Sequence, residues 1–233
     1  MRMPLPAHPI ALAKASPVLD AWTCDLARSA TDIETLASAL SADEQGRAAR
    51  FGRTELRDRY IVGRATLRVL LAARLGVGPR DVVIVRGRRG RPHVANAQAL
   101  DFNVSHTDGI ALFGITEGQR IGVDIEHSER KVNVDGVARK FMSAREQAQL
   151  AGLDADARRR ALLRLWTCKE AMSKATGDAL SAPFRGMDVS IGTTLRLEDG
   201  PPPYAPAHWR LVTLEVPGGY LATAALWHER DLP

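Results

Sequence analysis

The chain has few cysteines, few aromatic residues and no long apolar run, and each absence excludes a class of protein. Two cysteines in 233 residues cannot form a disulfide framework, which favours a reducing compartment and a cytoplasmic location. No apolar stretch is long enough to cross a bilayer, and the Pro-containing N-terminus lacks the apolar centre of a signal peptide. Because only 5% of the residues are aromatic, we do not expect a surface that stacks nucleic-acid bases.

What the chain does have is an excess of basic residues. It carries 32 Lys and Arg against 27 Asp and Glu, a formal net charge of +5. That balance favours an anionic partner, such as a phosphorylated small molecule or an acidic protein, although a solvated surface rich in arginine gives the same count. The length allows one large domain or two small ones with real cores.

The order of predicted elements indicates an α+β fold, because helices precede antiparallel strands in each half of the chain. Helices are predicted within 31–41, 41–76, 132–141 and 144–152 and around Trp166, and strands at 81–85, 100–106, 110–116, 120–126, 209–216 and 220–227. Ser41 and Glu44 fit a capping box. We place a boundary between an N-terminal half, 1–117, and a C-terminal half, 118–233, and find no repeat at the residue level. The Pro-rich stretch 199–208 is predicted to be an exposed loop.

Two carboxylates in "RIGVDIEH" suggest a cation site. Strand alternation places Asp124 and Glu126 on one face, about 6.5–7 Å apart, where they repel unless they face water or share a cation such as Mg2+. In "LWTCKEAMSKATG", a predicted helix ending at Gly177, Glu170 interrupts an apolar face and Lys174 follows one turn later. If this helix crosses the strand, Glu170 supplies a third carboxylate and Lys174 can neutralise a phosphate.

Plainer interpretations of these residues stay open. An Asp-x-Glu pair on a strand often marks a solvated face. Glu170 and Lys174 also have the i,i+4 spacing of an exposed helix pair, worth a few tenths of a kcal/mol. In "FNVSHTDG", the side chains of Asn103 and Ser105 and the backbone near His106 offer hydrogen-bond donors at a strand end, which can hold an anion.

Five segments in order along the chain resemble the motifs of one family. They are "GRP" at 90–92, "FNVSH" at 102–106, "GVDIE" at 122–126, "FMSAREQAQL" at 141–150 and "WTCKEAMSKATGDALS" at 166–181. Together they are similar to the motifs of the Sfp-type 4'-phosphopantetheinyl transferases. The resemblance implies two similar α/β halves with the active site in a cleft between them, the first half forming the wall that binds coenzyme A and the second carrying the metal site and the catalytic helix.

The resemblance also implies an activity. Enzymes of this family transfer 4'-phosphopantetheine from coenzyme A to a serine hydroxyl of an apo acyl or peptidyl carrier protein and release 3',5'-ADP. By motif, Asp124, Glu126 and Glu170 would hold Mg2+, with Mn2+ as a possible substitute. Glu170 would also be the general base for the serine, directly or through water, and Lys174 would bind the phosphate and stabilise charge.

Further residues are implied to contact coenzyme A. Ser105 and His106 match positions that contact its phosphates, and Asp124 and Lys174 contact it as well. Arg47 and Arg59 stand where the family often has basic residues near the 3'-phosphate, and Arg91 and Pro92 match its Gly-Lys-Pro. Lys169 belongs to the helix motif without an assigned role.

Three positions depart from the family pattern. Arg91 replaces the usual Lys, Glu44 stands where some members have a basic residue, and Asp178-Ala179 replaces a segment that commonly ends in Gly. The rival interpretation is a metal-dependent nuclease or phosphohydrolase, and a third is a binding module without turnover. The ordered motifs and the complete trio of acids favour the transferase, with no nucleic-acid or membrane partner. Because one chain holds the motifs of both cleft walls, we expect a monomer.

Overall fold

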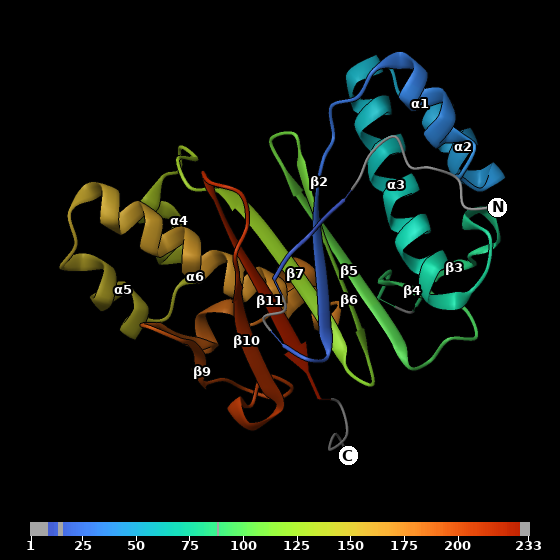
Figure 1. Cartoon of the computed structure of the whole chain (residues 1–233). Helices are drawn as coiled ribbons and strands as arrows, with labels where there is room; N and C mark the ends of the chain where they lie inside the picture. The colour runs from blue at the N-terminus through green and yellow to red at the C-terminus, as the bar shows by residue number, and fades with distance from the viewer. Residues whose placement is uncertain (1–8, 14–15, 88, 229–233) are drawn as a thin grey trace.

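The structure, a computed structural model of the whole chain, describes residues 9–13, 16–87 and 89–228. Residues 1–8, on which part of the signal-peptide interpretation depends, lie outside these ranges. Figure 1 shows two sheets at the centre, with a group of helices outside each of them. This arrangement confirms the α+β class. No helix in the described ranges has the length and apolarity needed to cross a membrane.

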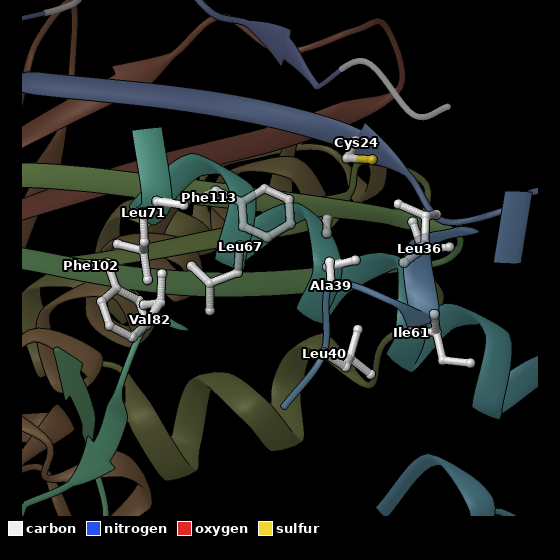
Figure 2. Close-up of a cluster of buried hydrophobic side chains, with 14 of the residues drawn as sticks. Cys24, Leu36, Ala39, Leu40, Ile61, Leu67, Leu71, Val82, Phe102 and Phe113 are labelled. Carbon is white, nitrogen blue, oxygen red and sulfur yellow. The ribbon is translucent and has the colours of Figure 1, made fainter. Parts of the chain in front are cut away.

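The first half packs one long helix against a four-stranded sheet. Its helices are α1 (Ala30–Ala37), α2 (Ala42–Ala49) and α3 (Thr54–Leu75), and the strand order is β1 (Ile10–Ala11), β2 (Leu19–Asp25), β6 (Ile110–Glu117) and β5 (Leu100–Thr107). A short hairpin of β3 (Ile84–Arg86) and β4 (Pro92–Val94) lies between α3 and β5. Buried Leu67 and Leu71 of α3 pack with Phe102 and Phe113 of the sheet (Figure 2).

The second half repeats this plan around a three-stranded sheet. Its helices are α4 (Val134–Phe141), α5 (Ala144–Ala151) and α6 (Ala155–Thr176), and the sheet order is β10 (Trp209–Leu214), β11 (Tyr220–Trp227) and β7 (Arg120–His127). A hairpin of β8 (Asp188–Ile191) and β9 (Leu195–Asp199) follows α6. Short 3-10 helices occur at Pro79–Asp81, Ala179–Ser181, Phe184–Gly186 and Pro206–His208.

The two halves share more detail than the sequence suggested. In each, two eight-residue helices precede a 22-residue helix, which ends at a glycine in the left-handed region, Gly76 or Gly177. The second helix of each set begins with a complete capping box, in "SADEQ" at 41–45 and "SAREQ" at 143–147. The expectation that the two halves share no repeat at the residue level is therefore wrong for these two segments. Each has a buried Glu as the third residue of its helix, Glu44 in α2 and Glu146 in α5.

The halves also share a core. Ile121, Val123 and Ile125 of β7 pack in one cluster with Leu112 of β6 and with apolar residues of β2, β10 and β11. The boundary predicted between residues 117 and 118 lies at the turn from β6 to β7, where Gly118 has φ +74°. Because this cluster spans the turn, neither half buries its sheet alone.

Two local predictions differ from the structure. The strand expected at 81–85 begins only at Ile84, because Pro79–Asp81 forms a 3-10 turn. The loop expected to be exposed at 199–208 contains Tyr204, which is fully buried. Tyr204 stacks on Trp209 and bonds to Thr176 and Asp178, so one aromatic side chain fastens the loop to the end of α6.

Candidate active site between the two halves

Side chains of β5 join the first half to the second. The neighbouring strands β5 and β7 belong to different sheets and share no ladder of backbone hydrogen bonds. Instead, polar side chains of β5 accept hydrogen bonds from the backbone of β7. Asp101 Oδ2 accepts a hydrogen bond from the Ile121 amide at 2.8 Å, and Asn103 Oδ1 accepts one from the Val123 amide at 2.9 Å. Asn103 of the "FNVSH" motif therefore serves the junction itself.

Gly122 lets α6 cross close over β7. A Cβ atom added at this glycine would lie 1.8 Å from the carbonyl oxygen of Ala171 and 2.7 Å from the amide nitrogen of Ala175. Any side chain here would force the helix away from the strand. Glycine at position 122 therefore brings Glu170 and Lys174 to the same face of β7 as Asp124 and Glu126.

Lys174 binds residues from both halves. Its Nζ donates to Asp124 Oδ1 at 2.6 Å, to Ser105 Oγ at 2.9 Å and to the Val123 carbonyl at 3.3 Å. Ser105 Oγ also donates to Asp124 Oδ1 at 2.8 Å. The expected meeting of the "FNVSH", "GVDIE" and helix motifs thus occurs at this point, and the ion pair that Lys174 forms is with Asp124.

Glu126 and Glu170 complete a group of three acids. Glu126 forms an ion pair with Arg130, and burial raises its pKa against the opposing charge of Arg130. Burial likewise raises the pKa of Glu170, while the charge of Lys174 lowers it and the charges of Asp124 and Glu126 raise it further. The charges of Asp124 and Glu126 therefore act on Glu170, as expected for carboxylates that lie near one another.

The donor set fits a hard divalent cation after side-chain movement. Among the described residues, no three His, Cys, Asp or Glu side chains are gathered into a ready metal site. Instead, Lys174 forms an ion pair with Asp124, and Arg130 forms one with Glu126. However, Asp124 Oδ2 is buried without a hydrogen-bond partner, and an anionic oxygen in that state needs a cation or a donor. Three carboxylates are the ligand type that Mg2+ prefers.

The remaining predicted site residues lie at different distances from this centre. His106 is exposed at the end of β5, and Pro92 pairs with Arg86 in the β3–β4 hairpin. Arg47, in the last turn of α2, lies over the ring of Tyr60, and Arg59 of α3 pairs with Glu55. The contacts seen for Arg47 and Arg59 are thus with first-half residues.

Arg91 is bonded within the protein. Its guanidinium makes a two-pronged ion pair with Asp101 at 2.7 Å for each bond, and it donates to the carbonyls of Ile121 at 2.6 Å and Lys174 at 2.9 Å. It therefore links the first half to β7 and to the end of α6. The planar five-donor fork of arginine makes this possible, whereas the lysine of the family motif has a single nitrogen.

A cavity of about 1080 Å³ lies at the opposite end of the β5–β7 junction. Its lining includes Arg91, Asp101, Gln119 and Trp227. It does not contain the three acids or Lys174, which come from the later part of β7 and the last two turns of α6. The carboxylate group is the stronger candidate for the chemistry, because it brings Asp124, Glu126 and Glu170 together beside Lys174, whereas the cavity contains none of these four residues.

Three contributors to the site were not found from the sequence. Asp101 carries a recognisable signal, since Asp101, Asn103, Ser105 and Thr107 place a polar side chain at every second position of a buried strand. Arg130, four residues after Glu126, could have been noticed from its charge and spacing. No local pattern indicates that Glu146 of α5 pairs with Lys169 of α6.

Comparison with known proteins agrees with this geometry. A family model described as the 4'-phosphopantetheinyl transferase superfamily matches residues 120–225, and one described as the N-terminal part of 4'-phosphopantetheinyl transferase matches residues 25–114. The 4'-phosphopantetheinyl transferase HetI of Nostoc is 33% identical over 208 residues, covering 88% of this chain and 86% of the relative. The chain therefore belongs to the 4'-phosphopantetheinyl transferase superfamily.

Other relatives have the same description. The putative 4'-phosphopantetheinyl transferase slr0495 of Synechocystis is 30% identical over 82% of this chain and 77% of its own length. The 4'-phosphopantetheinyl transferase Sfp of Bacillus subtilis is 25% identical over 88% and 89%. Among solved structures, holo-[acyl-carrier-protein] synthase of Thermotoga maritima matches with a TM-score of 0.37 at 15% identity, covering 48% of this chain and 64% of that chain.

Proposed function

We propose that this chain transfers the 4'-phosphopantetheine group of coenzyme A to a serine hydroxyl of an apo acyl or peptidyl carrier protein and releases 3',5'-ADP. The observation that carries the proposal is the contact of Lys174 with both Ser105 and Asp124. It brings the three family motifs to one point beside Glu170. The relatives named as 4'-phosphopantetheinyl transferases support the same activity.

The reaction needs a base and a stabiliser of phosphate charge. The serine oxygen forms a bond to phosphorus, the pyrophosphate P–O bond breaks, and the serine proton passes to Glu170. Glu170 lies on the same side of α6 as Lys174 and near Asp124 and Glu126, so its carboxylate is the proposed acceptor of that proton. The Nζ of Lys174 already donates to an anionic oxygen, so it can donate to a phosphate oxygen in the same place.

Asp124, Glu126 and Glu170 are the residues that would hold Mg2+ or Mn2+. When bound, such an ion lowers the negative charge of the pyrophosphate and improves the leaving group. We assign phosphate contacts of coenzyme A to Ser105 and His106. Arg47, Arg59 and Pro92 are proposed to line the nucleotide. Arg91 is assigned to the junction between the halves, since its donors are bonded to protein oxygens.

One chain supplies both sides of the site, because Ser105 belongs to the first half and Lys174 to the second. We therefore propose that the active protein is a monomer, and that it acts in the cytoplasm on carrier proteins made there. Loss of activity on dilution to monomers would contradict the first of these points.

The deciding experiment is incubation with coenzyme A, Mg2+ and an apo carrier protein, followed by intact mass of the carrier. We expect the carrier to gain one phosphopantetheine group and 3',5'-ADP to appear in equal amount. A reaction without carrier serves as the control. Release of 3',5'-ADP at the same rate in that control would show a phosphohydrolase and overturn the transferase.

A further inference from the structure

Lys169 lies next to Glu170 in α6, yet its ammonium is directed into the protein. The side chain is fully buried. Its Nζ donates to the backbone carbonyls of Phe141 at 3.2 Å, Phe184 at 2.6 Å and Met187 at 2.9 Å, and it forms an ion pair with Glu146 at 2.6 Å. All of these partners are protein atoms, so Lys169 does not offer its charge to a substrate.

Glu146 connects this lysine to two further elements. One of its oxygens accepts the Ser143 amide at 2.8 Å in the capping box of α5, and the other accepts the Val189 amide of β8 at 2.9 Å. The carboxylate is itself fully buried. The pair therefore fixes α6 against α5, β8 and the segment after α6.

The first half contains the same pair without any chemistry beside it. Arg68 is the fifteenth residue of α3, as Lys169 is of α6, and Glu44 is the third residue of α2, as Glu146 is of α5. Arg68 pairs with Glu44 and donates to the carbonyls of Pro79 at 2.7 Å and Val82 at 3.0 Å in the segment after its helix.

The two copies differ at the positions that face the junction. The residue after Lys169 is Glu170, whereas the residue after Arg68 is Val69. In the same register, Lys174 of α6 corresponds to Ala73 of α3. The buried pair thus occurs in both halves, and the proposed base and phosphate-binding lysine occur in only one.

We propose that Lys169 is a positioning residue which, with Glu146, sets the rotation of α6 so that Glu170 faces Asp124 and Glu126. This inference rests on the proposed function. Successive helix residues point about 100° apart, so a side chain fixed to three carbonyls and a carboxylate determines where the next side chain points. The contact at Gly122 sets how closely α6 approaches β7.

Stability alone is a weak reason to keep such a pair. Both side chains of the pair are fully buried, and removing two charges from water is costly. Replacing a buried ion pair with uncharged residues of similar volume is often neutral or stabilising. A role in fixing geometry gives the pair a function that an apolar contact does not supply, because hydrogen bonds to several carbonyls are directional.

The test compares the pair in the second half with its counterpart in the first. The variants are K169M/E146Q and, as matched control, R68M/E44Q, so that neither leaves an unpaired buried charge. Unfolding in urea, kcat, KM for coenzyme A and the Kd for Mn2+ without substrate are measured where each variant is folded. We expect both to change stability, and only K169M/E146Q to lower kcat, on the order of tenfold, with KM for coenzyme A unchanged and Mn2+ binding weaker.

K169R, which keeps the charge and the donors, should recover most of the kcat. Equal kcat and equal Mn2+ affinity in the two double variants would overturn the inference and leave the proposed function intact. A wild-type protein that fails to modify a carrier overturns the proposed function instead, and the Mn2+ comparison then decides the positioning role. A wild-type protein that neither modifies a carrier nor binds Mn2+ overturns both.

Discussion

Lys174 and Asp124 form an ion pair that joins α6 to β7, with Nζ 2.6 Å from Oδ1. The lysine side chain keeps about a quarter of its surface exposed, whereas the aspartate is buried. The cation is therefore the partner that an incoming phosphate can reach. Helix spacing alone allows an exposed ion pair between Glu170 and Lys174. In the structure the ammonium of Lys174 pairs with Asp124 of β7 instead.

Replacing Glu170 with Gln should lower kcat far more than it weakens coenzyme A binding. Glutamine keeps the shape and one ligand oxygen, but it cannot accept the serine proton. General base catalysis is worth roughly 10²–10⁴-fold, and we expect a loss of kcat within that range. Single-turnover transfer to carrier together with calorimetric binding of coenzyme A measures both quantities. Normal turnover by E170Q would leave Glu170 with a structural part only.

Replacing Gly122 with Ala should disrupt the junction. The added methyl would overlap the Ala171 carbonyl, and overpacking of this kind costs about 1–3 kcal/mol or more in the free energy of unfolding. Gly46→Ala is the matched control, since nothing lies within 4 Å of its Cβ position in α2, and there we expect a gain of about 1 kcal/mol. Urea denaturation of both variants decides it, and an equally stable G122A would show that α6 can move aside.

The residues that meet between the two halves could be predicted from the sequence, but what holds them there could not. Asp124, Glu126, Glu170 and Lys174 stand in short motifs whose residue types predict a phosphate and cation site, and the structure brings these motifs together. The need for Gly122 comes from a helix that begins more than thirty residues later, and no local pattern reports that approach. The buried environment of Lys169 was equally hidden, because a lysine in a helix is expected to be solvent-exposed until its partners in α4, α5 and the segment after α6 are known.

Arg91 allows a test between two roles. Lysine at this position would restore the family motif, so a direct coenzyme A contact predicts that R91K binds coenzyme A as well as the wild type or better, at unchanged stability. The contacts with Asp101, Ile121 and Lys174 predict instead that R91K loses about 2–4 kcal/mol of unfolding free energy, because an ammonium cannot reach all three. Asp101→Asn should reproduce this loss. Urea denaturation and calorimetry on R91K and D101N separate the two roles.

The two capping-box glutamates should respond oppositely to pH. Burial alone would raise the pKa of Glu44, but the hydrogen bond from Arg68 and the charge of Arg64 outweigh it and hold the pKa below its ordinary value of 4.5. Its stabilising contribution is therefore present above pH 4.5 and is lost as the pH falls through the lowered pKa. Burial raises the pKa of Glu146 against the charge of Lys169, so its contribution is present below pH 4.5 and is lost as the pH rises through the raised pKa.

Unfolding free energies of E44Q and E146Q between pH 3 and 7 check these signs. The advantage of the wild type over E44Q should grow as the pH rises, and its advantage over E146Q should shrink. Gln keeps the size of Glu and one of its two accepting oxygens in both places, so the lost hydrogen bond and the packing change are similar in the two variants and the comparison is made on the pH dependence. If the wild-type advantage over E44Q and the advantage over E146Q changed with pH in the same way, Glu44 and Glu146 would titrate alike and the prediction would be wrong.

Salt should weaken the interaction with the carrier more than the interaction with coenzyme A. The chain has a formal net charge of +5. Arg130 is half-exposed beside Glu126, and the exposed Lys131 follows it in the chain. Attraction between such exposed charges and an acidic carrier surface mainly raises the encounter rate, and it is screened over about 8 Å at physiological ionic strength. In the proposed function the phosphates of coenzyme A instead bind Lys174, whose Nζ is partly buried against Asp124, where screening is weaker. We therefore expect KM for the carrier to rise more steeply than KM for coenzyme A across a NaCl series at fixed Mg2+, and K131A to flatten the carrier slope alone. Equal slopes would mean that apolar contacts, and not this basic surface, hold the carrier.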